Sequence, residues 1–311
     1  MCTRSHQLAI AASFIVIALA SAGAQAPVDR APQTFRSSVD LVTIQASVRD
    51  VRGRILRGLT PTDFEVRDNG ELRRIVELRS DQRSPVSFAI LVDMSGSMRV
   101  GPKVAMARQV FESVVAQLRS GEDEAAVFTF DSSMHERRGF TTNIESLKDA
   151  LTQFEAFGTT SLYDATATTA RHLAERTNTH RAIIVLTDGV DTSSHMTAAQ
   201  VSAVASAIDV PVYVVATVPF VDQRVMVEEA AQARSPGGAD VRDLADWTGG
   251  QLTFASTFGE ASSAASRIVD ELRQQYVLAI EAADSREWRR LDVRVKNPAA
   301  IVRTRSGYFG G

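Results

Sequence analysis

The sequence predicts an α/β protein, in which a doubly wound domain with a mainly parallel sheet is inserted into a small β-sandwich-like domain. Two observations predict this fold class. In the middle of the chain, continuous apolar runs such as 88–92 and 182–186 alternate with helical patterns, and such runs are typical of parallel strands buried on both faces. On both sides of this region, short segments alternate apolar with polar residues, which is the pattern of strands with one buried face.

The composition is that of a globular protein without a basic surplus. Of the 311 residues, 44% are apolar and 23% are charged, and the formal net charge is −3. This length suffices for one large domain or two modest ones. The charge gives no reason to expect a nucleic-acid partner, and we expect none.

Residues 1–24 have the pattern of a secretory signal peptide. Arg4 precedes an apolar run over 8–20, and residues 22–24 (AGA) fit the small-x-small cleavage motif. The run is shorter than the about 20 residues of a spanning helix, so we expect no membrane span after cleavage; an uncleaved N-terminal anchor is the alternative. The sequence therefore predicts an exported protein, located in the periplasm, at the cell surface or outside the cell. Cys2 is the single cysteine, so the mature chain would have no disulfide.

Residues 25–36 are predicted to be a linker and residues 37–83 an N-terminal β segment. The linker contains two prolines and few apolar residues. Apolar and polar residues alternate from 42 to 48, and Asn69-Gly70 lies between two strand-like runs. Because Asn-Gly accepts the positive φ angles of a two-residue hairpin turn, we expect a hairpin there.

Residues 84–274 form the predicted doubly wound domain. Its apolar runs are flanked by repeats of apolar residues at three- and four-residue spacing, the helical period. The predicted strands are 88–92, 125–130, 182–186 and 210–216, and the predicted helices are 104–118, 162–173 and 260–274.

Residues 275–311 are predicted to be a C-terminal β segment that pairs with 37–83. Leu291, Val293 and Val295 alternate with polar residues, and a further strand-like run follows. Neither flanking segment is long enough to bury a core by itself. We therefore expect the two to form one β domain around the inserted α/β domain.

Two aspartates follow buried strands, at the edge where open parallel sheets bind ligands. Asp93 comes directly after 88–92, and Asp188 follows the run that ends at Thr187. Two carboxylates close together are unfavourable unless a cation neutralises them. Ser95 and Ser97, at alternate positions after Asp93, would add hydroxyl oxygens, which suit Mg²⁺ or Mn²⁺.

At these residues the sequence resembles the von Willebrand factor type A (VWA) domain, a Rossmann-like fold with a metal-ion-dependent adhesion site (MIDAS). The resemblance covers about residues 84–274. The family's ligand motif, Asp-x-Ser-x-Ser, a later threonine and a Thr-Asp-Gly turn, matches Asp93, Ser95, Ser97, Thr160 and Asp188. Thr159 competes for the threonine position, but the spacing to the following helix favours Thr160. The flanks 59–71 and 302–309 are similar to a group of bacterial exported proteins related to this domain.

The resemblance implies a metal-bridged protein-binding module. It implies Mg²⁺, or alternatively Mn²⁺ or Ca²⁺, as the bound ion, and a partner protein whose Asp or Glu side chain replaces a metal-bound water. It also implies that a shift at the site can move the last helix, 260–274. We expect no enzymatic activity.

Two alternatives belong to other functional classes. A metal-dependent phosphohydrolase of the haloacid dehalogenase type would need an acid two residues after Asp93, where this chain has Ser95, and a lysine near the phosphate; Lys103 and Lys148 lie in no suitable motif. A structural module without a working metal site would need a broken ligand set. Asp131 and Asp191 are interpreted as loop or capping residues.

Overall fold

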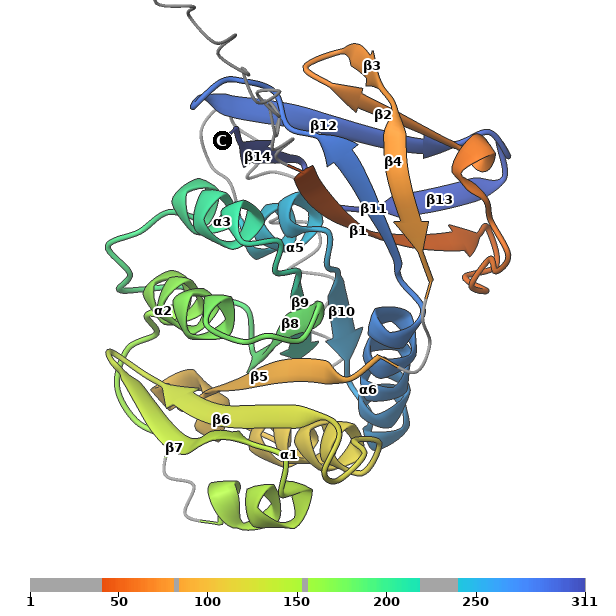
Figure 1. The fold of residues 1–311 in the computed structure, drawn as a ribbon. Coiled ribbons are helices and arrows are strands. Elements are labelled where there is room, and N and C mark those ends of the chain that lie inside the picture. Colours follow the sequence, from red (N-terminus) through yellow and green to blue (C-terminus); the bar gives the residue numbers. More distant parts are fainter. Residues whose placement is uncertain (1–40, 81–83, 153–155, 219–239, 311) are drawn as a thin grey trace, which may run out of the picture. The chain divides into compact units, whose positions relative to one another are not determined.

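The computed structural model describes residues 41–80, 84–152, 156–218 and 240–310. The predicted signal peptide (1–24) and linker (25–36) lie outside the described residues. Within the described part, two antiparallel sheets lie together on one side of an α/β region (Figure 1).

Six strands form the central sheet, in the order β10-β9-β8-β5-β6-β7. All neighbouring pairs are parallel except β6 and β7. The strands are β5 (Val86–Asp93), β6 (Glu124–Phe130), β7 (Met134–Thr141), β8 (His180–Thr187), β9 (Val212–Thr217) and β10 (Leu252–Ala255). Every residue of β5 is buried, as expected for a central strand covered on both faces.

Helices cover both faces of this sheet (Figure 1). On β5, Ile90 packs into the core that contains α1 and α6, whereas its neighbour Leu91 packs into the core that contains α2, α3 and α5. This alternation follows from the two-residue period of a strand. The helices are α1 (Lys103–Val115), α2 (Leu162–Ala174), α3 (Ala198–Ala207), α5 (Val241–Thr248) and α6 (Phe258–Arg273), and the 3-10 helices are η1 (Pro61–Asp63), η2 (Gly96–Arg99) and η3 (Ile144–Leu151).

The chain segments on both sides of the α/β region build a β-sandwich. One sheet has the order β13-β1-β11-β4 and the other β14-β12-β2-β3. Ile44 of β1 lies opposite Leu278 of β11, and Val66 of β2 lies opposite Val293 of β12; all four are buried in the core that both sheets share. The strands are β1 (Leu41–Asp50), β2 (Phe64–Asp68), β3 (Glu71–Arg73), β4 (Ile75–Arg79), β11 (Tyr276–Glu281), β12 (Trp288–Val295), β13 (Ala300–Arg303) and β14 (Gly307–Phe309).

The sandwich contacts the α/β region through buried polar groups. Arg305 pairs with Asp209, at 3.3 Å, and donates to the carbonyl of Ser206. The backbone N–H of Gln45 also donates to Asp209 Oδ2, at 3.2 Å. The left-handed Gly249 (φ +85°) ends α5 so close to Thr304 that a Cβ would lie 2.7 Å from the Thr304 carbonyl carbon. The contact between the two regions therefore includes a buried ion pair, hydrogen bonds to the backbone and a position where only glycine fits.

The predicted fold class is confirmed: a mostly parallel α/β sheet is flanked by a β domain from both ends of the chain. The α/β region begins with β5 at Val86 and ends with α6 at Arg273. The sequence did not predict the antiparallel edge strand β7 or the helices α3 and α5.

Asp123 precedes β6 and connects the end of α6, the segment after α1 and the start of β5. The carboxylate accepts hydrogen bonds from Arg273 (2.6 Å), from Arg119 and from the backbone N–H of Val86. Burial favours the protonated form, but these hydrogen bonds outweigh it and lower the pKa of Asp123 to about 2. Asp123 thus contributes stability that is complete above about pH 5 and is lost progressively as the pH falls from there through about 2.

We expect Asp123→Asn to reduce the free energy of unfolding at pH 7 by about 2 kcal/mol and to flatten its fall between pH 5 and 3. Urea unfolding across this pH range measures both effects. Glu145→Gln, at an exposed acid paired with Lys148, is the control and should leave stability unchanged. Equal pH profiles for the wild type and Asp123→Asn would contradict the assignment.

Candidate metal centre

The loop after β5 begins with a buried carboxylate. Asp93, the last residue of β5, is fully buried, and Ser95 is only 1% exposed. Asp93 Oδ1 accepts the backbone N–H of Ser95 (2.8 Å), and Oδ2 accepts the hydroxyl of Thr187 (2.6 Å). The Ser95 and Ser97 hydroxyl oxygens lie 3.1 Å apart. Three of the predicted ligands therefore lie together, with Ser97 at the exposed end.

Asp188 lies at the same edge of the sheet as Asp93, at the end of the neighbouring strand β8. It directly follows β8, which pairs in parallel with β5, and it is 4% exposed. Asp188 Oδ2 forms an ion pair with Lys103 Nζ at 3.0 Å. Among the described residues, Asp188 Oδ1 has no hydrogen-bond partner although it is buried. A buried carboxylate oxygen without a partner is unfavourable. This oxygen is therefore available to coordinate a cation.

The two carboxylates interact electrostatically. Burial raises the pKa of Asp93 to about 6, the hydrogen bonds from Thr187 and Ser95 oppose this rise, and the charge of Asp188 adds to it. Ionisation of Asp93 therefore costs more free energy in this environment than in water, although the carboxyl group is still mostly ionised at neutral pH. A nearby cation would stabilise the ionised form.

Thr160 lies in a loop that is hydrogen-bonded to the Asp93 loop. The N–H of Phe157 donates to the carbonyl of Met94 (2.7 Å), and the N–H of Gly96 donates to the carbonyl of Gly158 (3.0 Å). Thr160 is buried, and its N–H donates to the Thr192 hydroxyl at 2.9 Å. Its own hydroxyl makes no hydrogen bond to the other four predicted ligands within the part of the chain that the structure describes.

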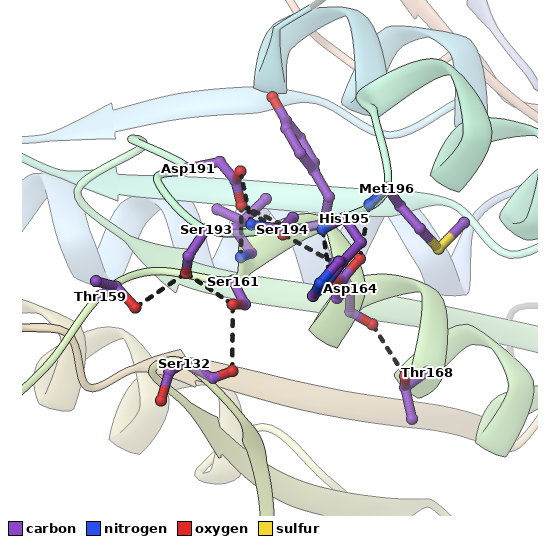
Figure 2. Close-up of polar contacts among 12 residues, drawn as sticks. Ser132, Thr159, Ser161, Asp164, Thr168, Asp191, Ser193, Ser194, His195 and Met196 are labelled. Atoms are coloured by element: carbon purple, nitrogen blue, oxygen red, sulfur yellow. Dashed lines mark hydrogen bonds and ion pairs between the residues drawn. The ribbon is translucent and has the colours of Figure 1, made fainter.

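A network of hydroxyl groups connects the Thr160 loop to the loop after β8 (Figure 2). Ser193 Oγ lies 2.8 Å from Ser161 Oγ and 3.0 Å from Thr159 Oγ1. Asp191 accepts the N–H of Leu162, the first residue of α2, at 2.8 Å. This contact agrees with the interpretation of Asp191 as a loop or capping residue. Hydrogen bonds thus join three loops that are distant in the sequence.

The structure shows two residues at the site that the sequence did not assign to it. Thr187 bonds to Asp93, and Lys103 lies between Asp188 and the Ser97 carbonyl, 3.3 Å from that oxygen. Lys103 belongs to no suitable sequence motif, yet the structure places it at the site. Lys103 lies ten residues after Asp93, a spacing that corresponds to no motif. Its place at the site follows only from the packing of α1 beside β8, which the sequence does not specify. Lys148 instead pairs with Glu145.

These residues fit a hard divalent cation. Two carboxylates and the serine and threonine hydroxyls are oxygen ligands of the type that Mg²⁺ and Ca²⁺ prefer. No group of three His, Cys, Asp or Glu side chains suited to a metal occurs in the described ranges, so any site here depends on the hydroxyl groups. The unpartnered Asp188 Oδ1 is consistent with this ligand set.

Comparisons with known proteins agree with the fold. Residues 88–191 match the von Willebrand factor type A domain family. No curated protein matches the chain. Among solved structures, proximal thread matrix protein 1 from the mussel byssus, with a zinc-occupied MIDAS motif, has a TM-score of 0.50 at 15% identity, over 65% of this chain and 50% of that chain.

Two bacterial structures are also similar. A mutant of the PilB minor pilin from Streptococcus sanguinis has a TM-score of 0.47 at 11% identity and 62% coverage of each chain. The conserved hypothetical protein BatB from Bacteroides thetaiotaomicron has 0.45 at 16% identity, over 61% of this chain and all of that chain. The chain thus spans less than two thirds of the pilin and half of the byssus protein, and these identities show the fold alone. The match with the von Willebrand factor type A domain family, over residues 88–191, lies within the α/β region of this protein, from β5 to the loop after β8.

Proposed function

We propose that this protein binds a divalent cation and, through it, an acidic side chain of a partner protein. The proposed ligands are Asp93, Ser95, Ser97, Thr160 and Asp188, and the proposed ion is Mg²⁺, with Mn²⁺ or Ca²⁺ as alternatives. The observation that carries the proposal is the buried Asp93 beside the buried Asp188, whose Oδ1 has no partner among the described residues.

The residues of the Asp93 loop have distinct roles in this proposal. Thr187 and the backbone of Ser95 orient Asp93, so the carboxylate is preorganised. Ser97 lies at the exposed end, where a partner side chain can approach. The cation, when bound, supplies a positive charge with open coordination positions for an oxygen ligand. An Asp or Glu of the partner is therefore the expected ligand.

Lys103 competes with the cation for Asp188, because its ammonium group lies 3.0 Å from Oδ2. Lys103→Met removes this charge, and we expect the variant to bind Mn²⁺ about tenfold more tightly, as for the loss of one partly buried charge interaction. Isothermal titration with Mn²⁺ measures the change. Lys148→Met is the matched control, because Lys148 pairs with an exposed acid. Weaker or unchanged Mn²⁺ binding by Lys103→Met would show that Lys103 does not compete.

A non-enzymatic role agrees best with the side chains at the site. Ser95 occupies the position where a phosphohydrolase of the haloacid dehalogenase type requires an acid. Lys103 does lie at the site, as that chemistry requires, but its ammonium group is paired with Asp188. Ser95 is a poor proton donor to a leaving group. We therefore propose protein binding, or adhesion, instead of hydrolysis.

We also propose that the protein is exported, to the periplasm, the cell surface or the cell exterior. The support is the signal-like pattern of residues 1–24. In the described ranges, no helix has the length and apolar character needed to cross a membrane.

A capture experiment tests the proposed function. Wild type and Asp93→Ala are immobilised and exposed to the exported proteins of the source cells, in Mg²⁺ or in EDTA, and retained proteins are quantified by mass spectrometry. We expect a protein that only the wild type retains, and only in Mg²⁺. The same retained proteins under all four conditions would contradict metal-dependent binding.

A further inference from the structure

Strand β12 presents a row of alternate residues on the outer face of the sandwich. Leu291 and Val293 are buried in the core that both sheets share. Because successive side chains of a strand point to opposite faces, Trp288, Arg290 and Asp292 lie on the other face, along about 13 Å of strand. Trp288 and Arg290 are exposed, and Asp292 is half-buried. Solvent, and therefore a ligand, can reach this row.

Trp288 is held in place although it is exposed. It lies opposite Phe309 of β14, and the two rings meet edge to face, with 5.2 Å between their centres and 72° between their planes. Both rings remain exposed, by 38% and 51%. At Gly307, a Cβ would lie 2.5 Å from Cζ2 of Trp288 and 2.4 Å from the carbonyl oxygen of Arg289. The indole therefore covers a stretch of backbone with no room for a side chain, and these contacts restrict its orientation.

A hollow of about 640 Å³ lies beside this row. It is lined by Arg67, Asn69, Gly70, Arg290 and Asp292. The two guanidinium groups donate hydrogen bonds, the carboxylate accepts them, and the amide can do both. The outer face thus combines an aromatic ring with a hollow that offers donors and acceptors in alternation.

Arg290 carries the positive charge of the hollow that is not already paired. Arg67 pairs with Glu65, and Asp292 pairs with Arg294, each at 2.7 Å. Within the described ranges, the guanidinium group of Arg290 has no hydrogen-bond or ion-pair partner. The described sandwich segments also contain fifteen Arg and Lys against ten Asp and Glu, whereas the α/β region contains thirteen against twenty. An anionic group in the ligand is therefore favoured here.

We infer that Trp288, Arg290 and the hollow beside them bind a polysaccharide whose sugars carry carboxylate groups. The C–H groups on one face of a sugar ring pack against an indole, because the face of the aromatic ring carries partial negative charge. Arg290 binds the sugar carboxylate through charge-assisted hydrogen bonds. Sugar hydroxyl groups both donate and accept, so they match the mixed side chains of the hollow. This site lies on the sandwich and needs no metal ion.

The mixed charges distinguish this ligand from a single-stranded nucleic acid. Nucleic-acid bases also stack on aromatic side chains, but their binding sites combine such rings with a positively charged groove along the phosphates. On this face, Glu65 and Asp292 lie among the arginines. Carboxylates repel phosphate groups, whereas they accept hydrogen bonds from sugar hydroxyl groups. The face therefore fits a polysaccharide better.

Electrophoresis of the full chain in native gels that contain a polysaccharide tests the inference. The gels contain EDTA, so that no cation contributes, and either polygalacturonate or alginate as the polymer of acidic sugars. Methyl-esterified polygalacturonate has the same backbone without the charges. We expect at least one acidic polymer to retard the wild type, with a dissociation constant about tenfold lower than for the esterified polymer, as for one charge-assisted contact.

Two variants at the site have matched controls. Trp288→Ala and Arg290→Ala should each bind the acidic polymer about tenfold more weakly, through loss of stacking and of the charged contact. Phe258→Ala and Arg138→Ala, at exposed residues of the α/β region, should bind as the wild type does. Arg290 has no side-chain partner to lose, so its variant should keep the unfolding midpoint of the wild type and report binding alone.

Several results would overturn the inference. One is a wild type that neither acidic polymer retards, and others are equal retardation by the esterified polymer or undiminished binding by Arg290→Ala. Binding of an oligothymidylate that is lost in Trp288→Ala, without binding of an acidic polymer, would overturn it in favour of a nucleic-acid site. Because all gels contain EDTA, these outcomes are independent of the proposed metal centre, which Mn²⁺ titration tests separately.

Discussion

Replacing Asp93 by alanine is expected to abolish the rise in unfolding temperature that Mg²⁺ or Mn²⁺ gives the wild-type protein. A cation that binds only the folded state stabilises it by about 2.7 kcal/mol at one hundred times its dissociation constant. For a domain of this size, that corresponds to a rise of about 5–10 °C. Asp93 is the most deeply buried proposed ligand, and alanine removes both of its carboxylate oxygens. Thermal unfolding in EDTA and in each cation measures the effect.

Asp93→Asn provides the control for folding, because it keeps the size of the side chain and removes its charge. Burial raises the pKa of Asp93 to about 6. The folded state therefore binds this proton more tightly than the unfolded state, and it loses stability as the pH rises from about 4 to 6. At pH 8 in EDTA, Asp93→Asn should be at least as stable as the wild type, yet it should gain nothing from the cation. A variant that is stabilised by metal as much as the wild type would contradict the role of Asp93.

Replacing Glu271 by alanine is expected to cause the largest loss of stability. Glu271 lies in the last turn of α6 and is 3% exposed. It forms ion pairs with Arg49 (2.8 Å) and with Arg303, both from the sandwich, and it accepts the hydroxyl of the buried Tyr213 at 3.2 Å. Alanine would leave these groups without their acceptor, which costs about 3–5 kcal/mol when a buried pair is broken. The unfolding midpoint should fall by on the order of 10 °C.

Glu77→Ala is the matched control for this prediction. Glu77 also pairs with an arginine, Arg79, but both side chains are about half exposed. Exposed pairs of this kind contribute little, so the control should unfold as the wild type does. Calorimetry of both variants in EDTA measures the difference without any contribution from a metal. A midpoint of Glu271→Ala equal to that of Glu77→Ala would show that Glu271 does not hold the sandwich and the α/β region together.

The strands of the central sheet were predictable because burial on both faces leaves a strong local pattern. The runs 88–92 and 182–186 lie inside β5 and β8. The edge strand β7 was missed because its central residues, 135–138 (HERR), are all exposed and polar or charged, so the strand shows no apolar period. The helix α3 was missed for the opposite reason. It contains mainly alanine, valine and serine, and this composition gives little contrast between a buried and an exposed face.

The positions of Asp93 and Asp188 at one sheet edge followed from strand order alone, since a carboxylate after each of two parallel strands reaches the same edge. The ion pair between Lys103 and Asp188 did not follow, because it joins residues from α1 and from the loop after β8. The same holds for the hydrogen bonds between Ser161 and Ser193. Such contacts depend on loop conformations that no short sequence pattern specifies.

A crystal structure in the presence of Mn²⁺ tests the metal site most directly, since the anomalous signal of manganese locates the ion without reference to the protein. We predict an anomalous peak about 2.0–2.6 Å from oxygen atoms of Asp93, Ser95 and Ser97, the range of metal–oxygen distances for Mg²⁺ and Ca²⁺. We also predict that Lys103 moves away from Asp188. A crystal at saturating Mn²⁺ without a peak at this edge, and with the pair between Lys103 and Asp188 intact, would contradict the proposed metal centre.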